Sequence, residues 1–222
     1  MTIHYHNVPA TFINIPKTGT TSLKKWSLQH IKDCEVVTDP TNEKHLYSLS
    51  FDEITHRWSN PGTTFTFVRN PFSRLVSMFH HIGQDAEYRM EIRRQGLDRH
   101  SIRSTPIESD IKILSIYKKG FENWIINNQF QESKCSLLHA LYNVKNDTQI
   151  NWLSNKIPDI VIKLEEIDIT FHKVQELLNC HVPILHLNTS EHKPYRDYYN
   201  NVTKQIVEEW FKEDLETFNY EF

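Results

Sequence analysis

The chain has 222 residues, a length within the range of one domain and sufficient to bury a hydrophobic core. Hydrophobic residues make up 38% and charged residues 24%, a composition that excludes an intrinsically disordered chain. The formal net charge of -3 argues against a general nucleic-acid-binding protein, because such proteins carry an excess of Lys and Arg. No apolar run approaches the ~20 residues that span a bilayer, and Met1–Pro9 lacks the apolar segment of a signal peptide. We therefore expect a cytoplasmic protein without a membrane span.

The predicted secondary structure alternates between strands and helices along the chain. The strand segments are rich in β-branched and aromatic residues, and the helical segments carry apolar residues at helical spacing. In chain order, we expect a strand over 10–15, a helix over 20–30, a strand over 34–38, a helix over 50–58, a strand over 63–68, a helix over 70–82, helical structure over 111–127, a strand over 159–164, and helices over 168–178 and 203–211. This alternation predicts one α/β domain over residues 1–222, with a mainly parallel central sheet flanked by helices.

The segment over 84–108 is expected to be irregular. Gly83 is predicted to end the helix that Asn70 and Pro71 begin. Beyond it the sequence is charged and contains five arginines, at Arg89, Arg93, Arg94, Arg99 and Arg103. A solvated helix or loop is the favoured interpretation, and this segment is the expected variable insertion. The alternative is a basic face that meets an acidic binding partner.

Neither the cysteines nor the histidines indicate a metal site. Cys34, Cys135 and Cys180 are odd in number and far apart, which is typical of reduced thiols. His80 and His81 are adjacent, and adjacent residues of a helix do not share a face. We expect no metal.

The first motif joins the predicted strand over 10–15 to the helix that follows. Its sequence is Ile15-Pro16-Lys17-Thr18-Gly19-Thr20-Thr21-Ser22. Free backbone N–H groups and the helix dipole converge at such a junction, which suits it to binding phosphate. Gly19 allows the backbone to approach an anion closely, and Lys17 supplies positive charge. Hydroxyl donors come from Thr18, Thr20, Thr21 and Ser22. A Thr-rich helix cap with a surface lysine is the alternative, but it does not explain why Lys17 and four hydroxyls cluster around one glycine.

Lysine precedes glycine in this motif, so the motif lacks the Walker A order of nucleoside-triphosphate hydrolases. The stretch from Phe12 to Leu23 resembles the 5′-phosphosulfate-binding loop of sulfotransferases that use 3′-phosphoadenosine 5′-phosphosulfate (PAPS). It is most similar to the carbohydrate, or family 2, branch. The resemblance implies a P-loop-like three-layer fold. It also implies that the loop wraps the 5′-phosphate of PAPS, with Lys17 near the bridging oxygen of the phosphosulfate.

The second motif, Phe67–Phe79, follows the predicted strand over 63–68. Arg69 lies at the carboxyl end of that strand, where ligands bind in such sheets, and its guanidinium can hold a phosphate in bidentate fashion. Ser77 lies on the helix that follows. Each residue alone is compatible with a structural role. Together they resemble the 3′-phosphate-binding motif of the same sulfotransferases, in which Asn70 replaces an Asp that the family often carries.

Later segments also resemble the family, over 162–165, 186–190 and 214–220. The resemblance therefore spans nearly the whole chain, and residues 84–158 match only loosely.

A hydroxyl that attacks sulfur must lose a proton, so a positioned base is expected. Histidine suits this task near neutral pH. His45 and His56 lie between the two motifs, and related enzymes carry a histidine in the stretch that holds His45. His45 is therefore favoured over His56, which falls within a predicted helix; the remaining alternative is that neither is catalytic. The implied reaction is an in-line displacement, in which Lys17 stabilises charge on the bridging oxygen.

The resemblance implies sulfuryl transfer from PAPS to an acceptor hydroxyl on a carbohydrate or small metabolite, without a metal, and with adenosine 3′,5′-bisphosphate as the second product. The polar segment over 192–196 either closes over PAPS, holds an anionic acceptor or is a solvated loop. One alternative function is a PAPS- or glycan-binding protein without catalysis. The other is an ATP-dependent phosphotransferase, which would need a Walker-type loop and a carboxylate for magnesium.

Overall fold

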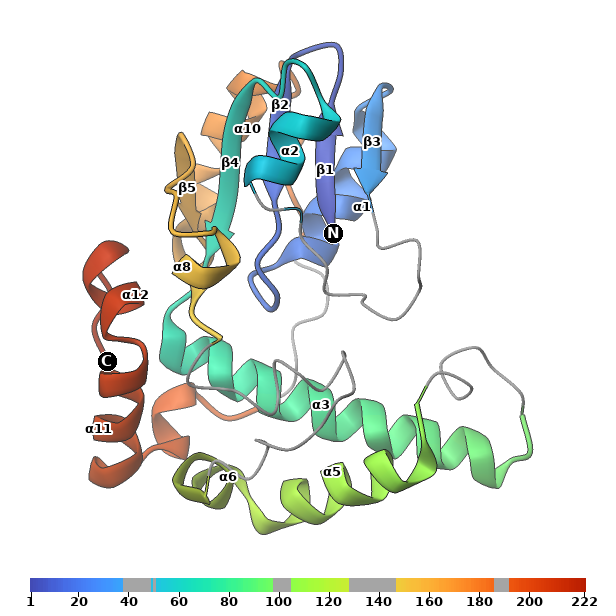
Figure 1. The fold of residues 1–222 in the computed structure, drawn as a ribbon, viewed down its shortest axis with the longest axis vertical. Helices are drawn as coiled ribbons and strands as arrows, with labels where there is room; N and C mark the ends of the chain where they lie inside the picture. Colours follow the sequence, from blue (N-terminus) through green and yellow to red (C-terminus); the bar gives the residue numbers. More distant parts are fainter. Residues whose placement is uncertain (38–48, 50, 98–104, 128–146, 186–191) are drawn as a thin grey trace.

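The computed structural model describes residues 1–37, 49, 51–97, 105–127, 147–185 and 192–222 (Figure 1). Its sheet has five strands in the order β3-β1-β2-β4-β5. The strands are β1 (Thr2–Tyr5), β2 (Ala10–Ile13), β3 (Cys34–Val37), β4 (Thr63–Val68) and β5 (Ile160–Lys163). β2, β4 and β5 pair in parallel, whereas β1 is antiparallel to both of its neighbours, β2 and β3. The expected α/β class is confirmed, with a mixed sheet.

The sequence does not predict strand β1, because the strand lies in a stretch of mostly polar residues. All four of its residues are buried. The Tyr5 hydroxyl lies 2.7 Å from Ser27 Oγ, and His4 Nδ1 lies 2.9 Å from Thr11 Oγ1. Since these hydrogen bonds satisfy the polar groups, a strand of this composition can occupy the interior of the sheet.

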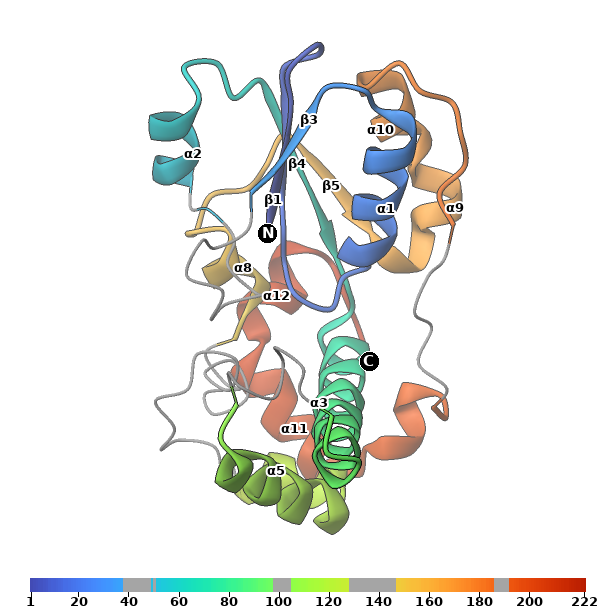
Figure 2. The ribbon, with the colours of Figure 1, turned by 90° about the vertical axis from the view of Figure 1, so that its right-hand side faces the viewer.

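Helices cover both faces of the sheet (Figure 2). One face carries α1 (Thr20–His30), α9 (Ile167–Thr170) and α10 (His172–Leu177), and the other carries α2 (Phe51–Arg57) and α8 (Gln149–Trp152). A helical layer lies beyond the end of the sheet at which β4 finishes (Figure 1), and it contains α3 (Pro71–Arg94), α5 (Ile107–Lys119), α6 (Phe121–Asn127) and α11 (Asn201–Trp210). The remaining described helices are α12 (Lys212–Thr217) and the 3-10 turns η2 (Leu164–Glu166) and η3 (Tyr195–Tyr198).

The hydrophobic core follows this division into layers. Phe65 and Phe67 of β4 pack on the sheet face that α1 covers, together with Trp26 of α1. Val68 packs on the opposite face with Ile54 of α2. A third cluster joins α3, α5, α6 and α11. The end of β4 therefore lies where all three clusters meet, and the second sequence motif begins at this point.

Helix α3 is longer than expected, because it continues past Gly83 to Arg94. Gly83 is buried inside the helix, and a Cβ at this position would lie 2.3 Å from the ring of Tyr117 on α5. The predicted helix end at Gly83 is therefore wrong. The glycine allows α3 and α5 to approach each other closely instead of ending a helix.

The first part of the segment over 84–108 is helical and belongs to α3, so of the expected solvated helix or loop the helix is confirmed there and the irregular structure is wrong. Arg89 donates to one oxygen of Asp110 from Nε at 2.9 Å and from Nη2 at 2.7 Å, and Arg93 binds the other oxygen. The Asp110 side chain is fully buried. These two arginines therefore hold α3 against α5, and they are not the solvated charges that the sequence predicts.

Candidate active site

The β2–α1 loop, residues 14–19, forms the first half of the candidate site. Lys17 has a φ of 69° and Gly19 a φ of 89°, both in the left-handed region. Gly19 is the N-cap residue of α1, and a Cβ there would lie 2.7 Å from Leu164 Cδ1. The loop can therefore turn directly into α1, which leaves the first N–H groups of this helix available to an anion.

Two of the predicted hydroxyls hold the shape of this loop. Thr18 donates from Oγ1 to the carbonyl of Ile15 at 2.8 Å, and its side chain is buried. Thr20 donates to the side chain of Asn14 and, at 3.3 Å, to the carbonyl of Ile15. The other two predicted hydroxyls lie on the first turn of α1, at Thr21 and Ser22.

The second half of the site begins where β4 passes into α3. The predicted cap is confirmed, because the Asn70 side chain accepts the N–H of Phe72 at 3.0 Å and Pro71 is the first helical residue. The Asn70 backbone N–H donates to Glu165 Oε1 at 2.8 Å, and its side-chain amide donates to the carbonyl of Glu221 at 2.7 Å. Glu165, in the late segment 162–165 that resembles the family, and Glu221 near the end of the chain thus hold the start of α3 in place.

Arg69 connects the two motifs directly. Its Nε donates to Ser73 Oγ at 3.0 Å, and its Nη1 donates to the backbone carbonyl of Lys17 at 3.4 Å. Ser77 lies one helical turn beyond Ser73 and is 4% exposed. The structure therefore brings the predicted residues Lys17, Arg69 and Ser77 to one region, although the two motifs are far apart in sequence.

Burial leaves the cations of this region poorly solvated. It lowers the pKa of Lys17 from 10.5 to about 8, and the nearby charges of Arg69 and Arg74 act in the same direction while Asp85 opposes them. Burial also lowers the pKa of Arg69 from its ordinary value, with Glu165 opposing the shift. A bound anion would favour the charged forms of both side chains, so the electrostatics suit a phosphate ligand.

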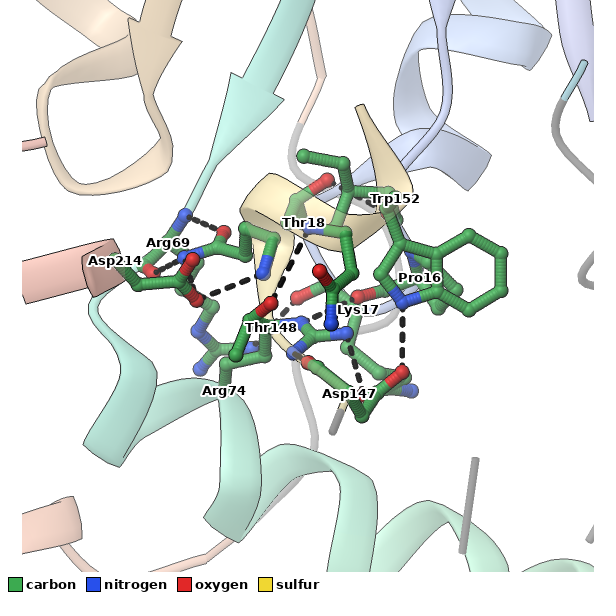
Figure 3. A network of polar contacts seen from close by, with 12 residues as sticks. Pro16, Lys17, Thr18, Arg69, Arg74, Asp147, Thr148, Trp152 and Asp214 are labelled. Atoms are coloured by element: carbon green, nitrogen blue, oxygen red, sulfur yellow. Dashed lines mark hydrogen bonds and ion pairs between the residues drawn. The ribbon is translucent and has the colours of Figure 1, made fainter. Parts of the chain in front are cut away.

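A buried network around Arg74 fixes the loop to the helix (Figure 3). Arg74 donates from Nε to the carbonyl of Pro16 at 2.9 Å, from Nη1 to the carbonyl of Asp147 at 2.6 Å, and from Nη2 to Asp147 Oδ2 at 2.7 Å. The indole of Trp152 donates to the other carboxylate oxygen of Asp147 at 2.6 Å. The sequence does not reveal this network, because Arg74 and Asp147 are 73 positions apart and no spacing links them.

Gln149 and Asp214 form a second connection that the sequence does not reveal. Gln149 accepts the N–H of Arg69 at 2.8 Å and donates to the carbonyl of Arg69 at 2.9 Å. Asp214 accepts the backbone N–H groups of Gln149 and Ile150 at 2.8 and 3.0 Å. Asp214 of α12 therefore holds Gln149 of α8 in place, and Gln149 in turn holds the backbone of Arg69.

The two histidines considered as bases, His45 and His56, differ from each other and from His80 of α3 in their positions. His45 lies outside the described residues. His56 is exposed on α2, the helix that covers the sheet face opposite α1. His80 Nδ1 lies 3.1 Å from the hydroxyl of Tyr117 and Nε2 lies 2.8 Å from that of Tyr198, so both ring nitrogens are hydrogen-bonded.

The described part of the polar segment over 192–196 packs on protein groups. The ring of His192 stacks on His80, with 5.4 Å between the centroids. The Arg196 guanidinium lies over the rings of Tyr195 and Phe222, at 4.9 and 5.7 Å from their centroids. Contact with PAPS or with an acceptor remains a prediction for this segment.

The described part of the chain contains neither a metal site of clustered ligands nor a membrane-spanning helix. No group of three or more His, Cys, Asp or Glu side chains there is arranged to hold a metal ion. No helix of that part is both long and apolar enough to cross a membrane.

Comparison with protein families identifies the class of this protein. A model of the sulfotransferase family matches residues 9–221, which is nearly the whole chain. The chain therefore belongs to this family, whose members are transferases of sulfuryl groups, and the resemblance seen in the two motifs is confirmed. No curated protein and no solved structure gives a match.

Replacement of Lys17 by Met should stabilise the ligand-free protein. The lowering of the Lys17 pKa from 10.5 to about 8 corresponds to about 3 kcal/mol of unfavourable charge burial at neutral pH, of which solvent screening removes a part. Between pH 8 and 10.5 the native wild type loses this proton before the unfolded chain does, so its free energy of unfolding rises with pH. The gain in the free energy of unfolding of Lys17→Met over the wild type should therefore be largest at pH 7 and small above pH 10. Chemical denaturation at the two pH values measures it.

Lys25, an exposed lysine of α1, the helix that follows the loop, provides the matched control. Lys25→Met should leave the free energy of unfolding unchanged at both pH values. A Lys17→Met protein that is equally destabilised at pH 7 and pH 10 would instead show that the Lys17 side chain makes a necessary structural contact.

Proposed function

We propose that this protein transfers a sulfuryl group from PAPS to an acceptor hydroxyl on a carbohydrate or small metabolite. The observation that carries the proposal is the contact between the two phosphate motifs, in which Arg69 Nη1 lies 3.4 Å from the carbonyl of Lys17. A loop suited to a 5′-phosphate thus adjoins an arginine suited to a 3′-phosphate. A nucleotide that carries both groups fits this pair of motifs, and membership of the sulfotransferase family supports PAPS as the donor.

Each predicted residue has a role in holding the donor. The N–H groups from Gly19 to Thr21, with Lys17, bind the 5′-phosphate, while Arg69 and Ser77 bind the 3′-phosphate. The hydroxyls of Thr18 and Thr20 keep the loop in shape, because both donate to acceptors within it. Binding of the donor restores a full positive charge to Lys17, whose pKa is lowered to about 8 in the ligand-free site.

The reaction is a direct displacement at sulfur. The acceptor oxygen forms a bond to sulfur while the bond from sulfur to the bridging oxygen breaks. The electron pair of the broken bond stays on the leaving 5′-phosphate, and the acceptor proton passes to His45. Lys17 stabilises the negative charge that develops on the bridging oxygen, in a site where burial strengthens electrostatic interactions.

The 3′-phosphate should account for much of the nucleotide affinity. Adenosine 3′,5′-bisphosphate should bind about ten- to a hundred-fold more tightly than adenosine 5′-monophosphate, because a charge-assisted hydrogen bond contributes about 1.5 to 3 kcal/mol. Titration calorimetry with the two nucleotides measures this ratio. Arg69→Gln should weaken binding of the bisphosphate and leave the monophosphate unaffected, which removes the preference.

Arg57 on α2, whose side chain is 47% exposed, provides a control that also removes one arginine. Arg57→Gln should keep the full preference for the bisphosphate. Equal affinity of the wild-type protein for the two nucleotides would contradict the assignment of Arg69 and Ser77.

His45 should be needed for transfer and not for donor binding. His45→Ala should lower turnover by about 10²- to 10⁴-fold, the usual contribution of a positioned base, because the acceptor keeps its proton. The affinity for adenosine 3′,5′-bisphosphate should stay close to that of the wild type. His56→Ala, measured beside it by release of the bisphosphate from PAPS, should be nearly as active as the wild type; the opposite pattern would transfer the role to His56.

A further inference from the structure

Arg69 lies one residue beyond the end of the hydrogen-bonded sheet. Strand β4 pairs with β5 as far as Val68, whose partner is Lys163, and its pairing with β2 ends earlier, at Thr66. Neither of these described ladders therefore reaches the peptide groups of Arg69. Backbone N–H and C=O groups away from water are unfavourable without partners, so other groups must satisfy the backbone at the residue proposed to bind the 3′-phosphate.

The side chain of Gln149 takes the place of a neighbouring strand at this point. Its Oε1 accepts the N–H of Arg69 at 2.8 Å, and its Nε2 donates to the carbonyl of Arg69 at 2.9 Å. Because a backbone N–H only donates and a carbonyl only accepts, these two bonds fix which end of the amide faces which group. Gln149 is fully buried, so water does not compete for either bond. The amide thus holds both peptide groups of Arg69.

Asp214 of α12 fixes the amide of Gln149 in turn. Its Oδ2 accepts the backbone N–H of Gln149 at 2.8 Å and lies 3.4 Å from Nε2 of the same residue, while Oδ1 accepts the N–H of Ile150 at 3.0 Å. Figure 3 shows Asp214 and Arg69 next to each other at one side of the buried network. Since carboxylate oxygens accept hydrogen bonds, Asp214 keeps the Nε2 end of the amide turned toward itself and toward the carbonyl of Arg69.

Ser73 holds the other end of Arg69. Its Oγ accepts the Nε–H of the guanidinium at 3.0 Å, and Nη1 donates to the carbonyl of Lys17 at 3.4 Å. A guanidinium carries five N–H groups. These bonds of the described residues use two of them, which leaves N–H groups on both Nη1 and Nη2, and two such nitrogens can bind one phosphate in bidentate fashion. Arg69 is therefore held at its backbone and at Nε, while its terminal edge stays open to a phosphate.

We propose that Gln149 and Ser73 are positioning residues for the 3′-phosphate of the donor, and that both act through Arg69. They hold the arginine in the orientation that receives the phosphate before the nucleotide binds, so that less conformational freedom is lost on binding. An arginine released at either end would keep its charge but would have to lose this freedom when the nucleotide binds. The inference rests on the proposed transfer from PAPS, and it assigns nucleotide selectivity in part to Gln149, a residue outside both sequence motifs.

The ratio of the affinities for adenosine 3′,5′-bisphosphate and adenosine 5′-monophosphate tests this role on the full chain. Gln149→Met keeps the approximate length of the side chain and removes both hydrogen bonds to Arg69. It should lower the ratio at least about tenfold, and Ser73→Ala, which removes one bond, should lower it about three- to tenfold. The affinity for the monophosphate should stay within about twofold of the wild type, because the change is confined to the 3′-phosphate. Titration calorimetry measures all four affinities.

Thr148, the residue before Gln149, provides the matched control. Its Oγ1 accepts the N–H of Asn151 at 3.2 Å and caps α8. Thr148→Ala should lower the free energy of unfolding, because a helix cap is lost, and should leave the ratio of the two affinities unchanged. The control thus separates a loss of stability in α8 from a loss of positioning at Arg69.

A double-mutant cycle shows whether Gln149 acts through Arg69. In the Arg69→Gln protein the preference for the bisphosphate is already lost, so the addition of Gln149→Met should change the ratio by less than about twofold. A further loss as large as that in the wild-type background would overturn the inference, because the two residues would then act independently. If Gln149→Met does not fold, Gln149→Asn takes its place in the cycle, since its shorter amide cannot reach both peptide groups.

The outcomes separate this inference from the proposed function. A wild-type protein that prefers the bisphosphate, together with folded Gln149 and Ser73 variants that keep the whole preference, overturns the inference and leaves PAPS as the donor. Failure of the wild type to bind adenosine 3′,5′-bisphosphate would instead reject the proposed function.

Discussion

The geometry of the candidate site depends on the buried guanidinium of Arg74. It binds the carbonyl of Pro16 in the β2–α1 loop and both the carbonyl and the carboxylate of Asp147. Removal of one partner from a buried ion pair typically costs about 3 to 5 kcal/mol, because the other charge stays buried without compensation. The loop is therefore held against α3, and this arrangement keeps Lys17 close to Arg69 although neither residue takes part in the ion pair.

The structure keeps positive charge in the site at a cost in stability. Burial lowers the pKa values of Lys17 and Arg69, and the neighbouring Arg74 adds to both shifts. Charge that is unfavourable in the ligand-free protein becomes favourable when an anion binds, so the same burial that weakens the fold strengthens recognition. The conformation of the β2–α1 loop also has a cost in stability, because the left-handed φ of 69° at Lys17 is unusual for a residue with a side chain.

Local patterns in the sequence predict the two motifs and most of the elements that carry them. The strand, glycine and helix around Gly19 are adjacent in the chain, as are Arg69 and its helix cap, so short-range rules suffice for them. The buried connections could not be predicted in this way, since Arg74 meets Asp147 across 73 positions and Gln149 meets Asp214 across 65. Polar residues of β1 are buried where side chains of β2 and α1 hydrogen-bond to them, and Gly83 lies mid-helix where α5 packs closely.

The paired motifs are proposed to bind a nucleotide with phosphates at the 3′ and 5′ positions, as a sulfuryl donor requires. Calorimetric titration with adenosine 3′,5′-bisphosphate, and separately with ATP and magnesium, is the decisive test of this assignment. The bisphosphate should bind clearly without added metal and ATP much more weakly, because the β2–α1 loop lacks the Walker A order. Tighter binding of magnesium–ATP than of the bisphosphate would contradict it.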